Sequence, residues 1–129
     1  MNKKHILIIE DDTGIQTVTQ FSLEIEEDWQ VTTALRGKEG LLKAKNLHPD
    51  VILLDIVMPD INGLEIIKEL QNNQATKKIP IILFTAKAMG NDILKLQNSV
   101  VIGIITKPFD CLTLSATISN ILDRQCRLV

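Results

Sequence analysis

The chain has few aromatic residues: three Phe, one Trp and no Tyr among 129 residues. Aromatic side chains that could stack on nucleic-acid bases are therefore too sparse to form a binding platform. The formal net charge is −2 and the basic residues are scattered, so no basic patch of the kind that attracts phosphate backbones is visible. We expect no direct binding to nucleic acid.

Cysteine, histidine and long apolar runs are also scarce. Cys111 and Cys126 are too few for a disulfide framework and lack metal-ligand spacing, so we expect free thiols in a reducing cytoplasm. His5 and His48 lie at the edges of predicted elements, where packing or solvent contact is a commoner role than metal binding. No apolar run approaches the ~20 residues that span a bilayer. The run behind the N-terminal lysines soon meets acids, which a signal peptide would not, and we expect a cytoplasmic protein without membrane contact.

Short aliphatic runs are what the sequence has instead. Five strand-like runs occur, at residues 6–9, 29–34, 51–54, 81–84 and 101–105. Runs of this kind between helical stretches predict buried strands of a parallel sheet. Hydrophobic residues make up 45% of the chain, which at this length suits one folded domain over residues 1–129.

Helical stretches alternate with these runs. We expect Thr13 to cap the first helix and Asp110 to cap the last. The apolar positions expected to face the core are Ile15, Val18, Phe21, Leu23 and Ile25 in the first helix, Leu41, Leu42, Ala44 and Leu47 in the second, Leu64, Ile66, Ile67 and Leu70 in the third, Ile93, Leu94 and Leu96 in the fourth, and Leu112, Leu114, Ile118, Ile121 and Leu122 in the last. Repeated alternation of strand and helix predicts an α/β fold, with a parallel sheet covered on both faces.

Polar residues stand at the ends of four of the predicted strands. Acids at 10–12 follow the first strand, Asp55 ends the third, Thr85 ends the fourth and Lys107 follows the fifth. The carboxyl ends of parallel strands meet at one edge of a sheet, where ligands of open α/β sheets bind. We therefore expect an acid cluster, a lone carboxylate, a hydroxyl and an ammonium to converge at one place.

These residue types suit the handling of a phosphoryl group. Glu10, Asp11 and Asp55 would repel one another unless a cation neutralises them, and Mg²⁺ favours carboxylate, water and phosphate oxygens. Asp55 can act as a nucleophile. Thr85 can donate a hydrogen bond, and Lys107 can place a positive charge at a phosphoryl oxygen. Positioning and charge neutralisation are most of what phosphoryl transfer requires.

Taken in this order, the motifs resemble the receiver domain of two-component response regulators, of the single-domain, chemotaxis-regulator-like type. The matching segments are Ile8-Ile9-Glu10-Asp11-Asp12, Leu53-Leu54-Asp55-Ile56-Val57-Met58-Pro59 with Gly63, Phe84-Thr85-Ala86, and Thr106-Lys107-Pro108-Phe109. The resemblance covers essentially the whole chain. It implies a flavodoxin-like (βα)5 fold with a five-stranded parallel sheet, and a protein that works as a monomer or weak dimer.

The resemblance also implies a function in phosphorelay signal transduction. A histidine kinase or phosphotransfer protein would donate a phosphoryl group to Asp55, and an unknown downstream protein would recognise the changed state. Thr85 and Lys107 are implied to contact the phosphoryl group, and the Lys107–Pro108 bond is implied to be cis, an isomer that costs only ~0.5–1 kcal/mol before proline. The chemistry would be Mg²⁺-dependent self-phosphorylation and dephosphorylation, without enzymatic turnover of other substrates.

A metal site follows from the same resemblance. Mg²⁺ is implied to bind Asp11, Asp55 and the backbone carbonyl of Val57, with Glu10 acting mainly through water. This assignment takes Glu10 and Asp11 as the acidic pair that directly follows the strand, and it leaves Asp12 to point toward the loop or to cap the helix.

One position departs from the family pattern. An aromatic residue is usual three positions before the lysine, and this chain has Ile104 there, a stiff β-branched side chain without a ring. The departure keeps a second interpretation open: a binding module with the receiver fold that does not depend on phosphorylation. A hydrolase with an aspartyl nucleophile is disfavoured because Val57 stands where its general acid is needed. Acids at 10–12 likewise occupy the turn where a dinucleotide enzyme needs a glycine-rich loop.

Overall fold

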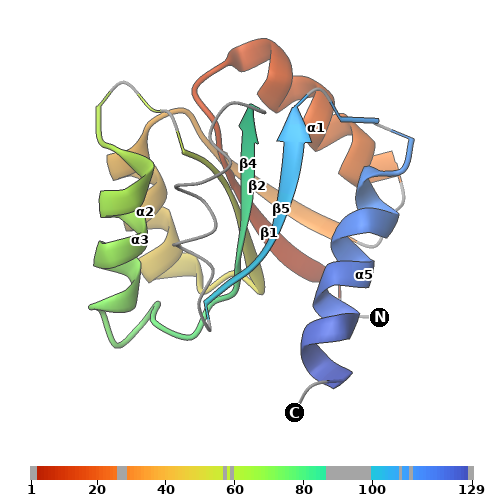
Figure 1. Cartoon of the computed structure of the whole chain (residues 1–129). Coiled ribbons are helices and arrows are strands. Elements are labelled where there is room, and N and C mark those ends of the chain that lie inside the picture. Colours follow the sequence, from red (N-terminus) through yellow and green to blue (C-terminus); the bar gives the residue numbers. More distant parts are fainter. Residues whose placement is uncertain are drawn as a thin grey trace.

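Five parallel strands form one sheet, in the order β2-β1-β3-β4-β5 (Figure 1). In this computed structural model the strands are β1 Lys4–Ile9, β2 Trp29–Ala34, β3 Val51–Asp55, β4 Ile81–Ala86 and β5 Val101–Lys107. The structure describes residues 3–25, 29–56, 58, 60–86, 100–107, 109–110 and 112–127. The five predicted strands and the flavodoxin-like sheet are confirmed, because this strand order is one of the two common doubly wound orders.

Helices cover both faces of the sheet (Figure 1). The helices within the described residues are α1 Thr13–Ile25, α2 Gly37–Leu47, α3 Gly63–Gln71 and α5 Leu114–Arg127. Apolar residues of α1 and α5 join one core cluster with strand residues such as Ile8, Leu53 and Phe84. Residues of α2 and α3 join a second cluster, with Ile9 and Leu54 on the opposite face. The fourth predicted helix, near residues 91–97, lies outside the described residues.

The central strands are buried on both faces. In β1, Ile6 and Ile8 belong to the cluster under α1 and α5, whereas Leu7 and Ile9 belong to the cluster under α2 and α3. Each of these side chains is at most 1% exposed. A strand in this position needs an apolar side chain at every residue, which explains why the sequence shows continuous aliphatic runs instead of alternation.

The α3 helix packs as its sequence predicts, but α1 does not. Ile66, Ile67 and Leu70 of α3 are buried. In α1 the prediction is wrong for three of its five apolar residues, because Val18, Phe21 and Ile25 are 47%, 66% and 59% exposed. Leu23 is buried as predicted, and the other buried residues of α1 are Thr19 and Ser22.

The hydroxyl groups on the buried side of α1 are satisfied within the helix. Thr19 Oγ1 donates to the carbonyl of Ile15 at 2.6 Å, and Ser22 Oγ donates to the carbonyl of Val18 at 2.8 Å. A buried hydroxyl that has such a partner avoids most of the desolvation penalty. Small hydroxyl residues can therefore face the sheet, and Val18, Phe21 and Ile25 are turned outward.

Three further apolar predictions are also wrong. Leu42 and Leu47 of α2 are 60% and 45% exposed, because its buried stripe runs through Gly37, Gly40, Leu41 and Ala44 at helical spacing. Leu112 is 88% exposed because it lies in a turn before α5 and not in the helix. Asp110 accepts the backbone N–H of Leu112 at 2.9 Å and so stabilises that turn, while α5 itself begins at Leu114.

A close backbone contact fixes the loop that follows β3. The N–H of Gly63, the first residue of α3, donates to the carbonyl of Ile56 at 2.9 Å. A Cβ atom at position 63 would lie 2.6 Å from both Cα and O of Ile56, which is too close for any side chain. Glycine at this position therefore lets α3 start against the residue that directly follows Asp55.

Candidate functional site

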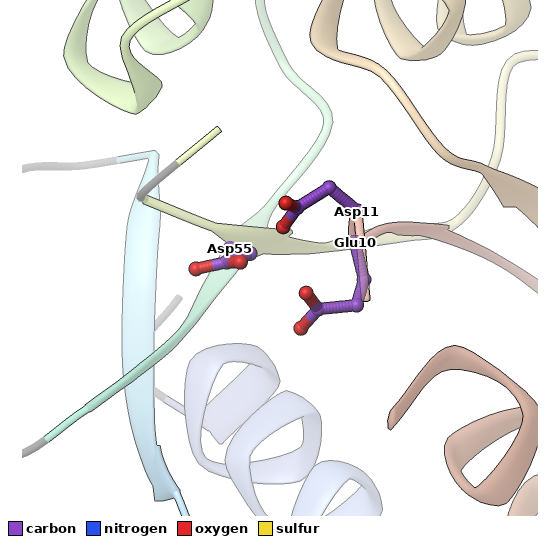
Figure 2. A group of neighbouring side chains, drawn as sticks. All are labelled: Glu10, Asp11 and Asp55. Carbon is purple, nitrogen blue, oxygen red and sulfur yellow. The ribbon is translucent and has the colours of Figure 1, made fainter. Parts of the chain in front are cut away.

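Three carboxylates meet where β1 and β3 end. Glu10 and Asp11 follow β1, Asp55 is the last residue of β3, and one carboxylate oxygen of each lies within 4.8 Å of the others. Figure 2 shows the Glu10 and Asp11 side chains directed toward the strand end that carries Asp55. Glu10 is fully buried and Asp55 is only 5% exposed, so the group lies largely below the surface.

The ammonium group of Lys107 completes this cluster. Lys107 Nζ lies 2.6 Å from Glu10 Oε1 and 3.4 Å from Asp55 Oδ2. The predicted convergence of the acids, Asp55 and the lysine is therefore present in the fold. Three carboxylates and one ammonium leave a formal excess of two negative charges at this place.

The electrostatics of the cluster follow from burial and crowding. Burial raises the pKa of Glu10 from 4.5 to about 7, and Asp55 adds to the rise, while Lys107 and the N–H of Asp12 oppose it. Burial works against the charged form of Lys107, but its contacts with Glu10 and Asp55 outweigh burial and raise its pKa. Glu10 Oε1 is buried, and the Lys107 ammonium is its ion-pair partner at 2.6 Å.

The donor set fits a hard divalent cation. Carboxylate oxygens in a tight group and an excess of negative charge are features that Mg²⁺ would satisfy. Glu10, Asp11 and Asp55 are the described residues that could hold such an ion. The fourth predicted ligand, the carbonyl of Val57, lies outside the described residues.

Asp12 and Gln16 support the acidic loop from α1. Asp12 Oδ1 accepts the N–H of Ile15 at 3.0 Å, so Asp12 caps α1 and the prediction that Thr13 does so is wrong. The N–H of Asp12 donates to Glu10 Oε2 at 3.1 Å. Gln16 Nε2 donates to the carbonyls of Glu10, at 3.3 Å, and Ala34, at 3.1 Å. These bonds hold the end of β1 against β2.

Asp60 is a supporting residue that the sequence analysis did not identify. Its carboxylate, in the loop between β3 and α3, accepts the N–H of Gly37 at 2.9 Å and of Lys38 at 3.1 Å. It thereby caps α2, whose own N-cap residue, Arg36, makes no side-chain cap bond. Desolvation works against ionisation of Asp60, but the N–H groups of Lys38 and Gly37 outweigh it and hold its pKa below the ordinary value.

Other predicted residues are placed only in part. Thr85 lies in β4 and pairs with Thr106 of β5, so its backbone is at the expected edge, but its side chain lies outside the described residues. Pro108, and with it the predicted cis bond, is outside them too. Ile104 is partly buried and packs against the core cluster under α2 and α3. The apolar residues expected near it, at 93–96, lie outside the described residues.

Comparison with known proteins decides the family. The sequence model that describes the response regulator receiver domain family matches residues 6–119 of this chain.

The chain belongs to the response regulator receiver domain family.

Relatives and solved structures agree with this assignment. The chain is 40% identical over 120 residues to Response regulator ArlR of Staphylococcus saprophyticus and 35% identical over 121 residues to Probable transcriptional regulator ycf29 of Porphyra purpurea. These matches cover 93% and 94% of this chain but 53% and 57% of the relatives, so the chain spans about half the length of the curated relatives it matches.

Two solved structures have the same fold over nearly their whole length. A CheY-like response regulator receiver domain protein of Methanospirillum hungatei has a TM-score of 0.85 at 30% identity, with 99% of this chain and 100% of that one covered. The chemotaxis response regulator CheY4 of Vibrio cholerae has a TM-score of 0.82 at 27% identity, with 93% and 99% covered. This receiver domain is therefore a module of two-component signalling and not a classical enzyme. Among its described helices, none is long and apolar enough to cross a membrane.

Proposed function

We propose that this receiver domain accepts a phosphoryl group on Asp55 and that Mg²⁺ supports the reaction. The observation that carries the proposal is the placement of Asp55, with Glu10, Asp11 and the Lys107 ammonium gathered around its carboxylate. A carboxylate flanked by acids and a cation is suited to phosphoryl transfer, where developing charge on the transferred group must be neutralised. We further propose that residues 1–129 act as one receiver unit.

The proposed reaction moves one phosphoryl group between two side chains. A carboxylate oxygen of Asp55 forms a bond to the phosphorus of a phosphohistidine on the donor protein. The phosphorus–nitrogen bond of the donor breaks, and its electron pair returns to the imidazole nitrogen. Lys107 then has a phosphoryl oxygen within reach in place of the Asp55 oxygen it now contacts at 3.4 Å. Thr85 is proposed to donate a hydrogen bond to another phosphoryl oxygen.

A divalent ion, when bound, would neutralise the carboxylates and the incoming phosphoryl oxygens. Glu10, Asp11 and Asp55 supply the described ligands, and the Val57 carbonyl is proposed as a further one. Glu10 acts mainly through water in this proposal. Its burial, and its contact with Lys107, suit a residue that sets the charge of the site without being modified.

Labelling with a small phosphodonor tests the acceptor. Incubation with Mg²⁺ and acetyl phosphate should add one phosphoryl group, measured by intact mass, and Asp55→Asn should abolish it. The matched control is Asp50→Asn, because Asp50 precedes the same strand at its opposite end. Full labelling of the Asp55→Asn protein, or loss of labelling in the Asp50→Asn protein alone, would contradict the assignment.

The proposed donor is a histidine kinase or histidine phosphotransfer protein that docks on α1. This helix starts beside the acidic loop, and Val18, Phe21 and Ile25 form an exposed apolar stripe along it. A donor that places its phosphohistidine at Asp55 must cover neighbouring surface, and an apolar stripe on the helix that follows the acidic loop suits that contact.

Docking on α1 can be separated from the chemistry. Phe21→Ser should slow transfer from a phosphorylated histidine phosphotransfer protein and leave labelling by acetyl phosphate unchanged. Leu42→Ser is the matched control, because Leu42 is similarly exposed, at 60% against 66%, on the helix layer of the other sheet face. Equal transfer rates for wild type and Phe21→Ser would exclude the stripe as the donor surface.

Ile104 supports a second candidate function. In the family pattern, an aromatic side chain at this position couples the phosphorylation site to the outer face of the domain. Ile104 packs against the core under α2 and α3 and has no ring to provide that coupling. A partner would then bind this receiver domain irrespective of phosphorylation. Equal partner affinity with and without the phosphoryl mimic beryllium fluoride would favour this function, because a ligand shifts a conformational equilibrium only by differential affinity.

A further inference from the structure

One of the four aromatic residues of the chain lies beside the site lysine, and a second packs against the first. Lys107 Nζ is 5.0 Å from the ring centroid of Phe84. The Phe84 ring in turn lies 5.0 Å from the ring centroid of Phe109, at an interplanar angle of 57°. In a chain so poor in aromatic residues, this placement calls for a physical explanation.

Strand register explains how Phe84 comes to lie next to the ammonium group. In β4, Phe84 pairs with Asp55 of β3 on one side and with Ile105 of β5 on the other. Lys107 is two residues beyond Ile105 on the same side of β5. Because β5 is the edge strand, the Lys107 side chain must reach across β4 to contact Asp55 of β3 and Glu10 after β1. Phe84 is the β4 residue over whose ring the Lys107 ammonium lies.

The Phe84 ring attracts the ammonium group of Lys107, which an aliphatic side chain of similar size would not do. The face of an aromatic ring is negatively polarised and attracts a cation within about 6 Å of its centroid, most strongly where water is excluded. Only 18% of the Lys107 side chain is exposed, and Phe84 is fully buried. A leucine at position 84 would fill most of the same volume but would leave the buried ammonium over a surface that does not attract it.

We propose that Phe84 is a positioning residue, whose ring holds the Lys107 ammonium over the site so that it is in place to contact the phosphoryl group. This inference rests on the proposed function for its effect on phosphorylation. The stacking itself does not, because it can be measured without any phosphodonor. The competing explanation is that Phe84 only fills the core under α1 and α5, to which its side chain also belongs.

Nuclear magnetic resonance measures the stacking directly. Protons above an aromatic ring are shielded, so the ε-methylene protons of Lys107 should resonate upfield of the other lysines, with Lys107→Met used for assignment. Phe84→Leu should move this resonance back to the ordinary lysine range. The matched control is Ile82→Val, which lies on the same strand and in the same core cluster and should leave the resonance upfield.

Phosphorylation by acetyl phosphate measures the consequence. Phe84→Leu should lower the rate by about three- to tenfold, as expected for loss of a partly desolvated cation–π contact. In a Lys107→Met background the same substitution should cause no further loss, because Phe84 acts through the lysine. Ile82→Val should keep the wild-type rate.

The outcomes separate this inference from the proposed function. An ordinary Lys107 resonance in the wild-type protein would overturn the inference, and this measurement does not require Phe84→Leu to fold. An equal loss of rate with and without Lys107 would overturn it as well. An upfield resonance that Phe84→Leu abolishes, in a protein that acetyl phosphate does not label, would support the stacking and contradict the proposed function.

Discussion

Two carboxylates at the same edge of the sheet are held in opposite ways. Glu10 is fully buried beside two further acids, and burial raises its pKa to about 7. Asp60 is exposed and accepts two backbone N–H groups at the start of α2, which keep its pKa low. Charged Glu10 therefore destabilises the folded protein, whereas charged Asp60 stabilises it.

The opposite pKa shifts of Glu10 and Asp60 distinguish residues that stabilise the fold from residues that serve the site. A cap such as Asp60 is explained by its own hydrogen bonds. The cluster of Glu10, Asp11 and Asp55 is not explained by stability, because gathered carboxylates oppose folding unless a cation is present. Lys107 supplies part of the compensation, and the proposed divalent ion supplies the rest. Three substitutions should sharpen this contrast, and the effect on stability should decrease from the first to the third.

The largest effect is expected for Lys107→Met. Removal of one partner from a buried ion pair leaves the other charge uncompensated, and the free energy of unfolding should fall by roughly 3 kcal/mol at about pH 8. The loss should be smaller at about pH 6, where Glu10 can take up a proton instead. Denaturant unfolding of the metal-free protein at both pH values measures this. A loss that does not change with pH would show that Lys107 does not compensate Glu10.

A smaller effect, of opposite sign, is expected for Glu10→Gln. The pKa of Glu10 is raised in the folded protein, so its contribution to stability is present below the ordinary value of 4.5 and is lost as pH rises through about 7. Above that pH, Glu10→Gln should stabilise the metal-free protein by on the order of 1–2 kcal/mol. Between about pH 5 and pH 8 the free energy of unfolding should decrease for wild type and should change less for the variant.

Mg²⁺ provides the control for the Glu10 prediction. If the acids are kept for a cation, added Mg²⁺ should stabilise wild type at about pH 8 and stabilise Glu10→Gln less. Equal stabilisation of both proteins would mean that the ion binds without help from the charge of Glu10.

The smallest effect is expected at Asp60. Asp60→Ala removes the cap of α2 and should cost about 1 kcal/mol near neutral pH, while Asp60→Asn, which keeps one acceptor oxygen, should cost less. The pKa of Asp60 lies below its ordinary 3.8, so its contribution is present above that value and is lost as pH falls further. Thermal unfolding measures the loss, with Glu69→Ala on the exposed side of α3 as a control. No difference between Asp60→Ala and Glu69→Ala would contradict the cap.

The two helices beside the site show how far the fold could be predicted. In α3 the large apolar residues lie at helical spacing on one face, and the rule that such residues face inward is correct. In α1 the same rule fails for Val18, Phe21 and Ile25. The reason is physical: the hydroxyls of Thr19 and Ser22 find partners inside their own helix, so polar residues can be buried there at little cost.

The site shows a similar division between what could and could not be predicted. Convergence of Glu10, Asp55 and Lys107 could be predicted because residues at the ends of parallel strands share an edge. The roles of Asp60 and Phe84 could not. Each acts on a group from another element, Asp60 on the N–H groups of α2 and Phe84 on an ammonium from β5, and sequence spacing contains no sign of these contacts.

The strand order has a consequence for how this protein can be monitored. β1 and β3 are adjacent in the sheet although α1, β2 and α2 separate them along the chain, so Glu10 and Asp55 meet only after distant segments have docked. Contacts of this kind form late, since long loops must close first. A chain in which β1 and β3 have not yet docked has no cluster to accept a ligand or a label. The fraction of molecules that can be labelled during refolding would thus measure the fraction in which these strands have docked, independently of any spectroscopic probe of helix or strand.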